Sequence, residues 1–239
     1  MAGHSKWANI KHRKARADAK KGKAFSKVTK EIISAVRLGG SDPKANTRLR
    51  LALAKAKAVN LPQENIQRNI KKASSKDGAD YHSVTYELYG AGGIGIICSA
   101  MTDNKNRCAS DIRIIQNKTS ATIADPGSVL FNFDQSGVIT INPEVNTLGE
   151  DRLFELSIEL GADDFINEEG LYRILTPLQD LHAIYEKLCE KEVIVESFEI
   201  EYLPKMYIEC SPEHQKSNEE ILERLDELDD IDDIYHNMA

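Results

Sequence analysis

The sequence predicts an α+β protein of three domains: an N-terminal three-helix basic domain followed by two α/β domains, the last ferredoxin-like and inserted in the second. Apolar residues recur every three or four positions up to about residue 73 and every second position afterwards. The charge changes sign nearby: residues 1–76 hold 20 Lys and Arg against 4 Asp and Glu, a net +16, and residues 77–239 hold 11 against 34, a net −23. A β-α-β-β-α-β order further along the chain indicates the ferredoxin-like unit.

The first predicted domain, residues 1–78, is an arm followed by three helices. Gly39-Gly40 ends the first helix, because glycine readily adopts the left-handed conformation found at helix ends. Ser41-Asp42, directly before Pro43, is typical of a helix cap followed by a first-turn proline and predicts the start of the second helix. The expected elements are an extended arm over 1–14 and helices over 15–38, from Pro43 onward and over 63–73.

The second predicted domain is discontinuous and comprises residues 79–135 plus 204–239. Alternating apolar residues on either side of a glycine-rich turn at 90–93 predict a β-hairpin. The segment after residue 204 is expected to supply a strand at 206–210, an acidic helix and a last strand. These three elements are too few to form a domain by themselves, so they are expected to complete the second domain. The carboxylates of the acid-rich tail, Glu219 to Asp233, are interpreted as a solvated helix face.

The third predicted domain, residues 136–203, lies between the two halves of the second. A turn at 136–137 is expected before its first strand. Thr147 and Glu150 have the spacing of a capping box and predict a helix start, and Thr176 repeats the pattern before a second helix. A hairpin between the two helices and a long last strand complete the β-α-β-β-α-β order.

Positive charge is most concentrated in the first 30 residues, which hold ten Lys and Arg against one acid, Asp18. Each Lys or Arg that meets a phosphate releases a condensed counterion, so a basic module on an acidic protein indicates a polyanionic partner. The predicted partner is nucleic acid, either duplex DNA or ribosomal RNA in the ribosome. Two alternatives remain: the charges only solvate helix faces, or the basic domain docks on the protein's own acidic body.

The candidate nucleic-acid-binding residues are basic side chains of the arm and helices, together with the single tryptophan. They are Lys6, Trp7, Lys11, Arg13, Lys14, Arg16, Lys20, Lys21, Lys23, Lys27, Lys30, Arg48, Arg50 and Arg68. Trp7 either anchors the arm by burying its ring or stacks on a base. No helix is predicted to carry Asn, Gln and Arg at groove spacing, which favours weak sequence specificity or structured RNA over an operator reader.

No motif indicates an enzyme, a cofactor, a metal site or a small-molecule substrate. Gly90, Gly92 and Gly95 match the letters of a dinucleotide fingerprint, but they precede a strand and not a helix N-terminus. The four cysteines are too widely spaced for a metal knuckle or a disulfide framework. No apolar run approaches the roughly 20 residues that span a bilayer, so a cytoplasmic protein without membrane contact is expected.

Several motifs along the whole chain form one family signature. They are Met1 to Lys11, Asp18 with Lys20 to Lys27, Gly39-Gly40, Asn46, Leu49-Arg50, Ala54 to Ala56, Pro62 to Ile66, Tyr86-Glu87, Gly92-Gly93, Thr102 to Asn104 and Gly127 to Val129. By these motifs the chain resembles the YebC/PmpR family of bacterial regulatory proteins. It departs at Leu88, Ala91 and Thr119-Ser120, where the family has glycine, proline and a glycine pair.

The resemblance implies three domains, with the last inserted in the second, and a DNA-binding transcriptional regulator. Some members are described as ribosome-associated factors that relieve stalling at proline-rich stretches, and the family is related to mitochondrial translational activators of cytochrome oxidase. A translation factor is therefore one alternative function. A protein-interaction scaffold is another, in which the acidic body binds a basic protein through a sheet face such as that around Tyr172 and Ile174.

Overall fold

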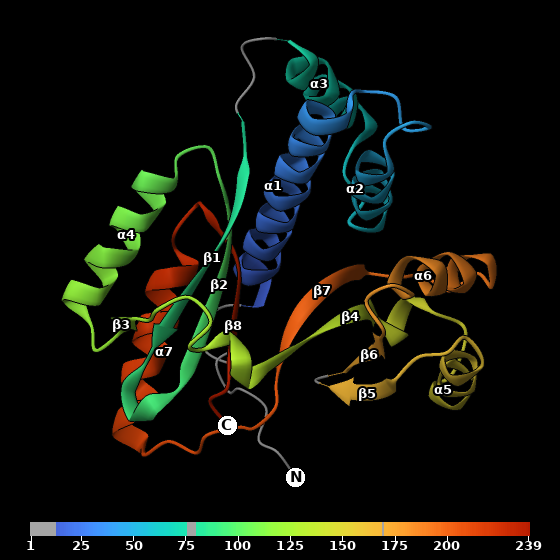
Figure 1. Ribbon diagram of the computed structural model, residues 1–239. Helices are drawn as coiled ribbons and strands as arrows, with labels where there is room; N and C mark the ends of the chain where they lie inside the picture. Colours follow the sequence, from blue (N-terminus) through green and yellow to red (C-terminus); the bar gives the residue numbers. More distant parts are fainter. Residues whose placement is uncertain (1–12, 76–79, 169) are drawn as a thin grey trace.

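The computed structural model describes residues 13–75, 80–168 and 170–239, with the backbone alone for residues 13–21. A long first helix stands beside two α/β units, each built from one sheet and helices on one of its faces (Figure 1). Every strand pairing within the two sheets is antiparallel. The predicted α+β fold class, with a helical region preceding two α/β units, is confirmed.

The helical domain packs three helices around one small core. Its helices are α1 (Arg13–Gly39), α2 (Thr47–Ala58) and α3 (Gln63–Ser74). Val28 and Ile32 lie one turn apart on α1 and are at most 1% exposed, so they form an apolar stripe that packs against the other two helices. Leu49 on α2 and Ile66 on α3 complete the contact. Burying each such side chain stabilises the fold by roughly 1.5–3 kcal/mol.

Asn46 determines where the second helix begins. Its side chain accepts a hydrogen bond from the Leu49 amide at 3.1 Å and donates to the carbonyls of Ala35 and Gly40, both at 2.8 Å. One buried amide thus caps α2 and fixes the loop to the end of α1. The prediction that α2 begins at Pro43 is wrong, because the cap lies after that proline in the chain.

The first sheet has the strand order β3-β1-β2-β8. Its strands are β1 (His82–Tyr89), β2 (Gly95–Thr102), β3 (Thr122–Ile123) and β8 (Ile231–His236). The helices α4 (Lys105–Lys118) and α7 (Pro212–Asp226) cover one face, where Leu88, Ile112 and Ile221 are fully buried. A short turn, η2 (Ala91–Gly93), leads directly into β2, as expected for the glycine motif. Because β8 pairs with β2, the end of the chain completes this sheet.

A buried carboxylate organises the loop that leads out of this sheet. Glu87 on β1 is 5% exposed and accepts hydrogen bonds from the amides of Gly127, Val129 and Leu130 at 2.5, 2.7 and 2.8 Å. Hydrogen bonds to an ionised acceptor are about twice as strong as neutral ones. Three amides of the loop over 125–132 are therefore held by one side chain.

Replacing Glu87 by glutamine is expected to lower the free energy of unfolding by about 2 kcal/mol, because one carboxylate oxygen becomes an NH₂ group that faces backbone donors. Chemical denaturation measures this directly. The exposed Glu144→Gln is the matched control and should change stability by less than about 0.5 kcal/mol. Equal effects of the two substitutions would contradict the role assigned to Glu87.

The second sheet has the strand order β5-β6-β4-β7, which is the order of a ferredoxin-like unit. Its strands are β4 (Phe133–Ile141), β5 (Asp164–Glu168), β6 (Leu171–Thr176) and β7 (Ser197–Pro204). The helices α5 (Glu150–Glu159) and α6 (Leu181–Glu190) cover one face and bury Ile139, Ile174 and Ile184. Tyr172 also belongs to this core and is 9% exposed. The sheet face suggested for a scaffold function is therefore the domain interior, and that suggestion is wrong.

Local features of this region differ from the sequence predictions. Residues 136–137 lie inside β4 and not in a turn, and Gly137 permits a close approach, since a Cβ there would lie 2.9 Å from that of Leu181. Neither α5 nor α6 has a side-chain cap, so both predicted capping patterns are wrong. The strand expected at 206–210 is, within the described chain, one isolated bridge between Ile208 and Met238.

Candidate nucleic-acid interface

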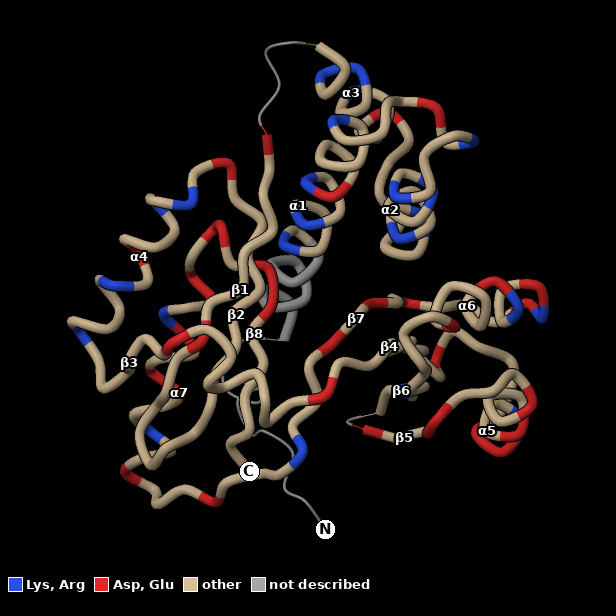
Figure 2. The backbone as a smooth tube through the Cα atoms, viewed as in Figure 1, with Lys and Arg blue, Asp and Glu red and all other residues tan. Residues whose placement is uncertain are grey.

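Opposite charges face each other where the helical domain meets the two sheets. Figure 2 shows Lys and Arg repeated along α1, α2 and α3, with Asp and Glu on the neighbouring β7 and β8. The helix α1 contacts β8, and α2 contacts β7. Which cations remain open to a partner therefore depends on how α1 packs against these two strands.

Three lysines on one face of α1 pair with carboxylates of the body. Lys23, Lys27 and Lys30 are spaced four and three residues apart, so they lie along one side of the helix. We call Lys23, Lys27, Lys30 and their partners the α1 ion-pair cluster. The Lys23 ammonium lies 2.5 Å from Asp226, and Lys30 lies 2.9 Å from both Asp232 and the carbonyl oxygen of Asp229.

Lys27 lies at the centre of the α1 ion-pair cluster. It bonds Glu199 on β7 and lies 2.8 Å from Asp233 on β8, so one side chain joins both sheets to α1. Burial alone would lower the pKa of Lys27, but the carboxylates of Glu199 and Asp233 raise it above the ordinary value of 10.5. Burial also raises the pKa of Asp232, while Lys30 opposes that shift. These charges form a desolvated contact within the molecule.

The raised pKa of Lys27 makes a prediction for alkaline pH. Its ammonium contributes stability that is fully present below the unfolded-state pKa of 10.5 and is lost as the pH rises through the higher folded-state pKa. The difference in unfolding free energy between the native chain and Lys27→Met should therefore shrink above about pH 10.5. Denaturation at several alkaline pH values measures it, with the exposed Lys72→Met as control. A constant difference would contradict this assignment.

Seven other cations are exposed and form no ion pair with a described residue. We call them the α2–α3 cations, and they are Lys44, Arg48, Arg50, Lys57, Arg68, Lys71 and Lys72. Residues 41–75, which contain them, hold eight basic residues against two acidic ones. The eighth, Lys55, pairs with Glu31 at 2.9 Å. Among the side chains that the structure describes in the helical domain, the open positive charge thus lies on α2, α3 and the loop before α2.

Two of the α2–α3 cations are oriented by local hydrogen bonds. The Arg50 guanidinium donates to the carbonyls of Pro43 and Lys44 at 3.2 and 3.1 Å and to the Thr47 hydroxyl at 3.1 Å. Arg68 donates to the Asn65 side chain at 3.1 Å. Both side chains stay exposed, so their remaining N–H groups can donate to phosphate oxygens.

The predicted site residues fall into three groups. Lys6, Trp7 and Lys11 lie outside the described residues, and the side chains of Arg13, Lys14, Arg16, Lys20 and Lys21 lie outside the described side chains. Lys23, Lys27 and Lys30 belong to the α1 ion-pair cluster. Arg48, Arg50 and Arg68 are exposed and lie in one domain.

Sequence reasoning missed residues on both sides of the contact. Lys44, Lys57, Lys71 and Lys72 were not among the candidates, although the excess of basic residues over 41–75 was visible in the sequence. Asp226, Asp232 and Asp233 were interpreted as solvated, and they pair with α1 instead. No local pattern could have identified these pairs, because the partners are about 200 positions apart in the chain.

Other kinds of site find no support in the described part of the chain. It contains no group of three or more His, Cys, Asp or Glu side chains placed to hold a metal ion. None of its helices combines the length and the apolar character needed to cross a bilayer.

Two family models together match nearly the whole chain. The model described as the TACO1/YebC protein N-terminal domain matches residues 5–76, and the model described as the TACO1/YebC second and third domain matches residues 81–238. The first match covers the helical domain, and the second covers both sheets.

Similar proteins are known from several bacteria. A probable transcriptional regulatory protein of Protochlamydia amoebophila is 53% identical over 238 residues, which cover 100% of this chain and 96% of the relative. One of Chlamydia trachomatis is 50% identical over 240 residues, covering 100% of both chains. The crystal structure of a conserved hypothetical protein from Aquifex aeolicus superimposes with a TM-score of 0.86 at 37% identity, covering 98% of this chain and 97% of that one.

Proposed function

Because this chain belongs to the TACO1/YebC family, we propose that it is a non-enzymatic regulatory protein that binds nucleic acid through the α2–α3 cations. Its relatives in Protochlamydia and Chlamydia are named probable transcriptional regulatory proteins, which supports a regulatory role. The observation that carries the proposal is the set of seven exposed cations that pair with no acidic residue in the described part of the chain. Such a surface binds phosphates by displacing their counterions. A role at DNA or ribosomes would place the protein in the cytoplasm.

The placement of the side chains on α3 favours binding to phosphates over recognition of a base sequence. It carries several amide side chains, which a base-reading helix would present outward. The Asn69 side chain instead donates to the Asn65 carbonyl at 2.8 Å, and Asn65 accepts from Arg68. Gln63 and Gln67 line a groove between α2 and α3. We therefore expect weak discrimination among duplex sequences.

Two targets remain within this proposal, duplex DNA and ribosomal RNA. The names of the relatives favour DNA, whereas the amides of α3, which line the groove or bond within the helix, favour structured RNA. Gel-shift titration of the full chain with a promoter duplex, beside co-sedimentation with purified ribosomes, separates them. We expect binding to at least one target, weakening steeply with added salt. Binding to neither would contradict the proposed function.

A further inference from the structure

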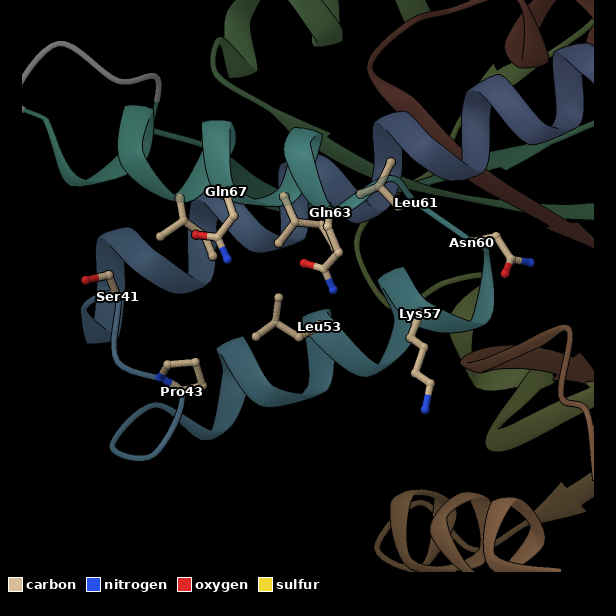
Figure 3. A pocket seen from close by; sticks show the side chains of 10 residues that line it. Ser41, Pro43, Leu53, Lys57, Asn60, Leu61, Gln63 and Gln67 are labelled. Atoms are coloured by element: carbon tan, nitrogen blue, oxygen red, sulfur yellow. The ribbon is translucent and has the colours of Figure 1, made fainter. Parts of the chain in front are cut away.

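A groove runs along the surface between α2 and α3, directly above the core of the helical domain. It has a volume of about 650 Å³, which falls in the roughly 300–1,000 Å³ range of small-ligand sites. Figure 3 shows Leu53 pointing from α2 toward α3, with the side chains of Gln63 and Gln67 pointing back across the gap. The loop residue Pro43 closes one end, and Lys57 lies near the other.

The groove combines three kinds of chemistry. Its floor is apolar and includes Ile66, which is buried, and Leu53 and Ile70, which stay partly exposed. Gln63 and Gln67 add amide groups that can both donate and accept hydrogen bonds. Leu53 and Lys57 are one turn apart on α2 and both line the groove, although the Lys57 ammonium extends away from α3 (Figure 3).

The positive charges near the groove indicate which class of ligand it can bind. The segment 41–75 holds eight basic residues against two acidic ones, and one of its exposed cations, Lys57, is among the residues that line the groove. The Arg50 guanidinium is fixed against the carbonyl of Pro43, a lining residue, which places an oriented cation at one end. An uncharged peptide would gain nothing from these cations, whereas a nucleotide offers an apolar base face, polar base edges and a phosphate.

We infer that this groove binds an unpaired base of a single-stranded nucleic acid, with the flanking phosphates on Arg50 and Lys57. The base would lie on Leu53 and Ile70, and its edge would meet the amides of Gln63 and Gln67. Paired bases keep their faces stacked inside the duplex, so only a splayed or single-stranded nucleotide can enter. The inference rests on the proposed function and adds to phosphate binding a contact that only an unpaired nucleotide can make.

The test compares one RNA strand in two forms. Fluorescence anisotropy measures the affinity of the full chain for a short labelled single-stranded RNA of mixed sequence and for the same strand annealed to its complement. The double variant Gln63→Ala/Gln67→Ala should lose about tenfold in affinity for the single strand and none for the duplex, as expected for removing contacts to one base. The exposed Gln179→Ala, on the inserted unit, is the control and should change neither affinity.

The outcomes separate this inference from the function on which it rests. Equal losses for both forms of RNA, or no loss for either, would overturn the base site while leaving phosphate binding intact. No loss for either form is also the result expected if the groove binds an apolar peptide. If the native chain binds neither form, RNA is not a target of the α2–α3 cations, and the base site is overturned together with RNA binding itself. Alanine is tolerated at exposed helical positions, and thermal unfolding checks that the double variant is folded.

Discussion

The triple variant Arg48→Gln/Arg68→Gln/Lys72→Gln is expected to bind nucleic acid roughly 100-fold more weakly than the native chain at physiological salt, because three phosphate contacts each release about one counterion. All three side chains are exposed and form no ion pair with a described residue, so glutamine leaves no buried carboxylate behind. Arg50 is left in place because it also holds the loop before α2. Anisotropy titration with a labelled duplex measures the loss.

The matched control removes the same charge from the acidic body. Lys118, Lys187 and Lys216 are exposed on α4, α6 and α7, and Lys118→Gln/Lys187→Gln/Lys216→Gln changes the net charge by the same amount. We expect its affinity to stay within about threefold of the native value, because screening limits charge effects beyond about 8 Å. If the control loses as much affinity as the α2–α3 variant, binding follows net charge and the proposed surface is wrong.

The second large effect is expected in stability. Lys27→Met should lower the free energy of unfolding by about 3–5 kcal/mol, because it leaves Glu199 and Asp233 close together and largely buried without a cation. Chemical denaturation measures the loss. The same substitution should loosen α1 from β7 and β8, which hydrogen exchange of the α1 amides would show as reduced protection.

Lys23→Met is the control on the same helix. Its pair with Asp226 is more exposed, at 31% and 47% for the two side chains, so its removal should cost no more than about 1 kcal/mol. Removing the stranded charges as well, in Lys27→Met/Glu199→Gln/Asp233→Asn, should restore most of the loss. Equal effects of Lys23→Met and Lys27→Met would contradict the central place of Lys27 in the α1 ion-pair cluster.

The sequence was sufficient to predict the helical domain, the hairpin and the ferredoxin-like order, because each depends on apolar periodicity within a short window. It was insufficient where one tertiary contact decides the local structure. Asn46 caps α2 by bonding the end of α1, and Gly137 continues a strand that pairs with β6 and β7, where the lack of a side chain makes room for a neighbouring helix. Neither contact leaves a local pattern, so the second helix start and the expected turn at 136–137 were misplaced.

The candidate site was likewise predicted only in part from the sequence. Composition indicated that the first third of the chain is strongly basic, and Arg48, Arg50 and Arg68 are indeed exposed. It could not indicate that Lys23, Lys27 and Lys30 meet carboxylates from the far end of the chain, because that contact exists only after the domains pack together. The alternative in which the basic domain docks on its own acidic body therefore describes residues 23–30 of α1, while the described cations of α2 and α3 keep their charge open.

The salt dependence of binding tests the central claim most directly. The affinity of the full native chain for a labelled duplex should be measured over a range of monovalent salt concentrations. If most of the α2–α3 cations meet phosphates, the logarithm of the association constant should fall with the logarithm of salt concentration at a slope of about −5. A slope near zero would show that these cations do not meet phosphates and would contradict the account.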